Sequence, residues 1–143
     1  MINENDGMMY MNVYSKKYWC LYKHVKQHMD EFKKQLRDAG VKNNGPFFYS
    51  VSRVLDDGFI GLELYQPAKE YREVIDKDIK FSSYFYIDNM LSSVVLDNFE
   101  FMEWTYSEIM QYMWDNNLKS RSNIYNEIHD SEEGRYIIVK VAV

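Results

Sequence analysis

Two stretches of the chain carry apolar residues at the three- and four-residue spacing of an amphipathic helix. Gly40 follows the first stretch and can take the left-handed conformation that ends a helix. The second stretch predicts a helix over about 98–117, with Asp97 as its cap and Glu100 completing a capping-box-like pattern. The apolar positions are Tyr18, Tyr22, Val25, Met29, Phe32 and Leu36 in the first stretch, and Phe99, Met102, Tyr106, Ile109 and Met113 in the second.

Extended runs precede and follow each predicted helix. LDDG between two of them is a strong hairpin signal, and DSEEG separates the last two. Each half of the chain is therefore predicted to form a β-α-β-β unit. The runs are MMYMNVYSKKYWC (8–20), PFFYSVSRV (46–54), FIGLELY (59–65), FSSYFYIDNMLSSVVL (81–96), NIYNEIH (123–129) and RYIIVKVAV (135–143).

The two halves repeat one another. A shift of 77 positions brings DAGVKNNGPFFYSV onto DNNLKSRSNIYNEI without a gap, and the apolar positions of the helices and final strands coincide as well. The sequence predicts one domain over 1–143, with copies at 8–65 and 81–143. The segment 66–80 joins them, and Pro67 could open a short helix there.

The predicted fold class is α+β: a tandem β-α-β-β repeat forming one antiparallel sheet with two long helices on one face. Alternation along the strands then sorts the side chains. The residues expected to face the helices are Ile60, Leu62, Leu64, Ile124, Ile128, Ile137, Val139 and Val141. Those expected on the other face are Phe48, Tyr65, Tyr125, Glu127, His129, Tyr136 and Lys140. A monomer that leaves an aromatic and charged face uncovered usually uses it for binding.

Composition narrows the function classes. A formal charge of −5 argues against a nucleic-acid binder, because neutralising phosphates requires a basic stripe. Cys20 is the only cysteine, so no internal disulfide can form and a cytoplasmic location is expected. We find no apolar run near the roughly 20 residues of a membrane span, no secretory leader in MINENDG, and no cofactor-binding fingerprint. The aromatic content of 17% suits a binding surface, and equally a Tyr-rich antiparallel sheet.

Two groups of residues suggest chemistry. Cys20, His24 and His28 would share one face of a helix, but they lack the glutamate of a zinc-binding H-E-x-x-H motif, so we interpret the histidines as exposed and unliganded. Glu127 and His129 stand two apart on one strand face. They could form an acid–base pair or take part in ligand binding, and the alternative is a surface Glu and His on a solvated strand.

The segment L-x-x-A-G followed by G-P-F-F-Y (36–40 and 45–49) resembles the helix end, Gly-Pro turn and strand of the GyrI-like effector-binding superfamily. That resemblance implies a small ligand between two modules, lined by aromatic residues. It also implies a glutamate, in the strand after the second helix, that meets cationic ligands. Glu127 is the acid in NIYNEIH, with Tyr125 beside it, although Asn123 could equally occupy the family's position. A buried carboxylate beside aromatic rings would suit an organic cation.

These observations predict a non-enzymatic module that binds a small apolar or cationic molecule on an open aromatic face between the copies. The expected ligand-binding residues are Glu127, Tyr125, His129, Phe48, Tyr65 and Tyr136. No helix-turn-helix can be fitted, so no DNA binding by the chain itself is expected. The chain also resembles small acidic, Tyr-rich Gram-positive proteins encoded near type VII-secretion toxin genes, which implies a protein-interaction module instead. Hydrolysis of a small molecule, as in some members of the GyrI-like superfamily, is a minority prediction.

Overall fold

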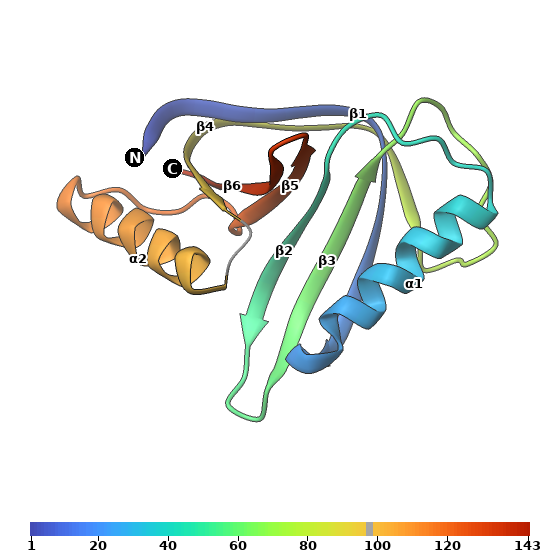
Figure 1. Ribbon diagram of the computed structural model, residues 1–143, viewed down its shortest axis with the longest axis horizontal. Coiled ribbons are helices and arrows are strands. Elements are labelled where there is room, and N and C mark those ends of the chain that lie inside the picture. The colour runs from blue at the N-terminus through green and yellow to red at the C-terminus, as the bar shows by residue number, and fades with distance from the viewer. Residues whose placement is uncertain (97–98) are drawn as a thin grey trace. The chain divides into compact units, whose positions relative to one another are not determined.

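The fold is α+β, with antiparallel strands and two α-helices in the part of the chain that the structure describes (Figure 1). The computed structural model describes residues 1–96 and 99–143, without the side chains of residues 99 and 100. The predicted cap at Asp97 and its Glu100 partner therefore lie outside the described side chains. The elements are β1 (Asn3–Leu21), a 3-10 turn (Tyr22–His24), α1 (Val25–Asp38), β2 (Phe47–Val54), β3 (Phe59–Pro67), β4 (Lys80–Leu96), α2 (Phe99–Asp115), β5 (Tyr125–Ser131) and β6 (Gly134–Ala142).

The chain forms two compact units, which we describe separately. The N-terminal unit contains Met9–Phe85, and the C-terminal unit contains Met1–Met8 together with Tyr86–Val143. The segment between the two predicted copies thus belongs to the N-terminal unit. Each unit contains a helix followed by a β-hairpin, as the sequence pattern predicts, while the 77-residue offset stays a prediction.

In the N-terminal unit, β3 pairs antiparallel with both β1 and β2. The hairpin predicted at LDDG joins β2 to β3, and Gly58 has the positive φ of 87° that its turn requires. Ile60, Leu62 and Leu64 of β3 are buried, as predicted. Lys16, opposite Leu64 in the β1–β3 register, hydrogen-bonds through its ammonium to α1, so this side of the sheet faces the helix.

The first helix begins later than predicted. Tyr18 and Cys20 belong to β1, where they lie opposite Leu62 and Ile60, so the prediction of a helix through Tyr18 was wrong. Backbone pairing with β3 fixes this segment as a strand. The Tyr18 ring nevertheless packs 4.4 Å from the ring of His28 on α1, which explains why Tyr18 fits the apolar stripe of the helix.

The predicted short helix at Pro67 was also wrong. Pro67 is the last residue of β3, opposite Val13 of β1, and no helix is present between Ala68 and Ile79. Proline has no backbone N–H to donate, and strand ends tolerate that loss. At the end of α1, by contrast, Gly40 has a φ of 80°, as its predicted role as a helix terminator requires.

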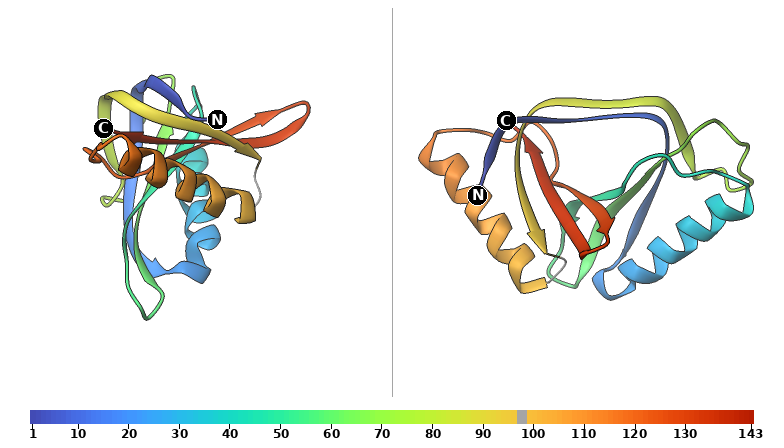
Figure 2. Two further views of the ribbon diagram at one scale, coloured as in Figure 1. Left: turned by 90° about the vertical axis from the view of Figure 1, so that its left-hand side faces the viewer. Right: turned by 45° about the horizontal axis from the view of Figure 1, so that its top comes forward.

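In the C-terminal unit, β6 pairs antiparallel with both β4 and β5, and α2 runs beside this sheet (Figure 2). The second predicted helix and the apolar face of the strands are confirmed. The core residues are Leu91, Val95, Ile109, Met113, Ile137, Val139 and Val141, with Met102, Tyr106, Ile124 and Ile128 packed against them. Among the described residues, no helix is both long and apolar enough to cross a membrane.

Candidate functional site

The predicted row of side chains on β5 is present in the C-terminal unit. Tyr125, Glu127 and His129 alternate along β5, opposite Lys140, Ile138 and Tyr136 of β6 respectively. Directly opposed residues of an antiparallel pair share a face, so Lys140 and Tyr136 stand on the same side as the row. The rings of His129 and Tyr136 stack with centroids 5.0 Å apart.

A group of charged side chains surrounds Glu127. Its Oε1 lies 3.3 Å from the Nζ of Lys140 and 3.1 Å from the Nε2 of His129. The Lys140 ammonium also donates to the carbonyl oxygen of Gly7 at 2.8 Å and lies 3.6 Å from the carboxylate of Asp6. We call these five residues the Glu127 cluster. All five belong to the C-terminal unit.

The face that carries this row is not open, contrary to the prediction. The Glu127 side chain is 1% exposed, and His129, at 25%, is the more accessible member of the pair. The Tyr125 ring is buried as well, and the charged groups pair with one another. Glu127 is therefore not a solvated surface residue. The predicted ligand-binding residues that are buried are Phe48, Tyr65, Tyr125 and Glu127, whereas His129 and Tyr136 are half-buried.

Asp6 is held in its ionised form. Burial acts to raise the pKa of this carboxyl, but the Ser92 hydroxyl, the Gly7 amide and the Lys140 ammonium together bring it below its ordinary value. The Gly7 amide donates to Asp6 Oδ1 at 2.7 Å. The Glu127 cluster thus contains a second acid that the sequence reasoning missed, since the N-terminal residues showed no recognisable pattern.

The other two predicted residues lie in an aromatic cluster of the N-terminal unit, formed by Tyr10, Phe48, Tyr65 and Phe85. Phe48 and Tyr65 are opposite each other in the β2–β3 register and stack at 4.6 Å with an angle of 7°. Phe85 meets both rings edge-on, at 5.0 and 5.3 Å, and Tyr10 lies 5.5 Å from Phe48. Tyr10 and Phe85 were missed, although both lie in the aromatic-rich extended runs that precede the helices.

The predicted sharing of one helix face by Cys20, His24 and His28 was wrong. Cys20 is buried in β1, His24 lies in the 3-10 turn, and His28 in α1 packs against Tyr18. Burial raises the pKa of the Cys20 thiol, which disfavours its reactive thiolate form. Within the described ranges, no three His, Cys, Asp or Glu residues are grouped to hold a metal ion.

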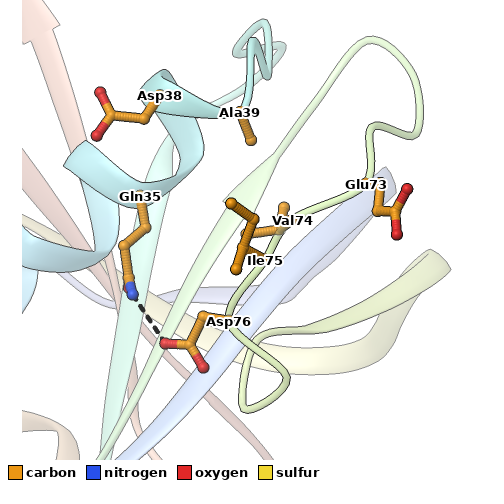
Figure 3. A pocket seen from close by; sticks show the side chains of 7 residues that line it. All are labelled: Gln35, Asp38, Ala39, Glu73, Val74, Ile75 and Asp76. Atoms are coloured by element: carbon orange, nitrogen blue, oxygen red, sulfur yellow. Dashed lines mark hydrogen bonds between the residues drawn. The ribbon is translucent and has the colours of Figure 1, made fainter.

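A cavity of about 370 Å³ lies in the N-terminal unit, between the end of α1 and the loop after β3 (Figure 3). The Gln35 amide points into it and donates to Asp76 at 2.8 Å. Asp76 also pairs with Lys16 at 2.6 Å, and this ammonium is the main reason that the pKa of Asp76 is about 2. The cavity lining is Gln35, Asp38, Ala39, Glu73, Val74, Ile75 and Asp76. Since its acidic groups are mostly paired within the protein, we regard it as structural.

Known structures share this fold at low sequence identity. The crystal structure of the EcmrR C-terminal domain is 11% identical, with a TM-score of 0.76 and 96% of both chains covered. EcmrR in its DNA complex gives a TM-score of 0.79 at 11% identity; 98% of this chain but 56% of EcmrR is covered, so the chain spans about half of that protein. SAV2435 bound to tetraphenylphosphonium is 11% identical, with a TM-score of 0.53, and 99% of this chain and 91% of SAV2435 are covered.

These likenesses, all at 11% identity, support the predicted GyrI-like fold. The chain belongs to the family described as domain of unknown function DUF5085, whose family model matches residues 9–143. No curated protein matches the sequence. The resemblance to proteins encoded near type VII-secretion toxin genes receives no support from these relatives.

Proposed function

We propose that the protein binds a small organic molecule, and that the Glu127 cluster with Tyr125 and Tyr136 supplies the contacts. The observation that carries this proposal is a buried carboxylate, Glu127, in a row of aromatic side chains. Burial strengthens electrostatic attraction because the local dielectric is low, and ring faces attract cations and apolar rings alike. His129 and Tyr136 form the more accessible end of the row, where a ligand would enter.

The fold supports the same proposal. SAV2435, which shares the fold, was solved bound to tetraphenylphosphonium, a small organic cation. By this proposal, the present chain binds molecules of similar size, either apolar or cationic. We propose the aromatic cluster with Phe48 and Tyr65, whose rings are buried, as a second candidate contact region for apolar ligands.

The test is a thermal-shift screen against tetraphenylphosphonium, cationic dyes and neutral aromatic compounds, followed by calorimetric titration of each hit. We expect at least one hit whose affinity falls tenfold or more in Glu127→Gln. The matched control is Glu132→Gln, at an exposed glutamate in the β5–β6 turn of the same unit, which should bind as the unmodified protein does. A screen with no hits, or hits bound equally by Glu127→Gln, would contradict the proposal.

Hydrolysis is a second candidate, favoured by the 3.1 Å contact between Glu127 and His129. Such a pair could activate water if a scissile group came within hydrogen-bond reach. Chromogenic esters and amides would be incubated with the protein and with His129→Gln. Turnover that disappears in this variant would support hydrolysis, whereas turnover that persists in it would count against this pair.

A further inference from the structure

Lys140 places a cation of the protein itself against the carboxylate of Glu127. It stands on β6, the strand paired on both sides in the C-terminal unit, opposite Tyr125 on β5 and Ser92 on β4. Its side chain is 8% exposed, and oxygen atoms of Gly7, Glu127 and Asp6 lie around the ammonium at 2.8, 3.3 and 3.6 Å. The Gly7 carbonyl accepts a hydrogen bond from this ammonium, and the two carboxylates pair with its charge.

This arrangement changes the charge that a ligand meets. The ammonium 3.3 Å from Glu127 offsets one of the two carboxylate charges in the cluster, so the attraction of the cluster for a second cation falls accordingly. To bind Glu127 directly, an organic cation would have to displace an ammonium held by three oxygens inside the protein. A neutral molecule with a hydrogen-bond acceptor avoids both costs, because the Lys140 ammonium carries three N–H donors and can share one with it.

We propose that Lys140 is a specificity-determining residue that directs the Glu127 cluster toward neutral aromatic molecules carrying a hydrogen-bond acceptor, and away from permanent organic cations. This inference rests on the proposed function and narrows it to one ligand class. It also predicts a difference from SAV2435, which was solved bound to a permanent cation. Replacing Lys140 with an uncharged side chain should expose the full charge of Glu127 and admit such cations.

The test uses two probes of nearly the same shape, triphenylphosphine oxide and methyltriphenylphosphonium. The first is neutral with an oxygen acceptor, and the second carries a methyl group and a permanent positive charge. Dissociation constants for both are measured by calorimetry with the unmodified protein, Lys140→Met, Lys140→Arg and the control Lys119→Met. Lys119 is an exposed lysine of the same unit, so its replacement leaves the Glu127 cluster intact.

We expect the unmodified protein, Lys140→Arg and Lys119→Met to bind the oxide at least tenfold more tightly than the phosphonium. Lys140→Met should gain at least tenfold in affinity for the phosphonium and none for the oxide. Tighter binding of the phosphonium by the unmodified protein would overturn the inference, whether or not Lys140→Met folds. Equal phosphonium affinity in Lys140→Met and the unmodified protein would overturn it too. If neither probe binds any of the four proteins, the inference fails, whereas the proposed function fails only if the wider thermal-shift screen also gives no hit.

Discussion

Replacing Lys140 by methionine should strongly destabilise the folded protein, because it leaves the Glu127 carboxylate buried without its ammonium partner. At 3.3 Å and an effective dielectric constant of about 20, the attraction between the two charges is about 5 kcal/mol. Desolvation of both groups offsets part of this gain, and removing one partner of a buried pair typically costs about 3–5 kcal/mol. With Glu127 1% exposed, we expect Lys140→Met to cost an amount in that range.

Glu127→Gln should lower the free energy of unfolding by less than Lys140→Met does, by about 1–3 kcal/mol. The reason is that Lys140 keeps the Gly7 carbonyl and the Asp6 carboxylate as partners. The double variant removes both charges, so its cost should be smaller than the sum of the two single costs by about 2 kcal/mol. The surface change Lys119→Met should alter the free energy of unfolding by no more than about 0.5 kcal/mol.

The assay is urea unfolding followed by tryptophan fluorescence at pH 7, applied to all four variants and the unmodified protein. It gives the free energy of unfolding of each, and the double-mutant cycle isolates the interaction between the two side chains. A coupling energy below about 0.5 kcal/mol, or a Lys140→Met variant as stable as the unmodified protein, would refute the claim that the buried pair contributes to the fold.

Three further predictions concern residues outside this pair. Because the Lys16 ammonium holds the pKa of Asp76 at about 2, below the ordinary 3.8, the stability from this ionised carboxylate is present above pH 4 and lost as the pH falls toward 2. Asp76→Asn should lower the free energy of unfolding by about 1 kcal/mol at pH 5. It should also reduce the decrease in that free energy between pH 5 and pH 2, as measured by urea unfolding. The buried Cys20 thiol should react with Ellman's reagent at least tenfold more slowly in the folded than in the unfolded chain. Tyr106→Phe removes the hydroxyl that donates to buried Asn126 and should cost about 1–3 kcal/mol in urea unfolding, whereas an unchanged midpoint would count against that hydrogen bond.

Most strands and the second helix could be predicted because each keeps a single apolar period along its length: two residues in a strand, and three to four in the helix. The first helix was extended too far toward the N-terminus because Tyr18 lies on the helix-facing side of β1 and contacts His28, so strand and helix share one apolar stripe. Pairing with β3 decides that segment, and such pairing with a strand some 40 residues away is invisible to local periodicity.

The candidate site was predicted in its residue types but not in its environment. Alternation correctly put Glu127 and Lys140 on one face, yet it could not show that their side chains pair or that they are buried. Burial and pairing depend on Gly7, whose carbonyl binds Lys140 from 133 positions away in the sequence, and on the neighbouring Asp6. These N-terminal residues follow no apolar pattern, so only the folded arrangement identifies them.

The most direct test of the account is to map the contact surface of a bound small molecule. Triphenylphosphine oxide would be titrated into ¹⁵N-labelled protein while backbone amide chemical shifts are recorded. The account predicts saturable chemical-shift changes that are largest along β5 and β6, at Tyr125–Ser131 and Gly134–Ala142. The affinity for the oxide derived from these changes should fall at least tenfold in Glu127→Gln. Saturable shifts confined to the cavity around Asp76, or no saturable shifts at all, would contradict the assignment of ligand binding to the Glu127 cluster.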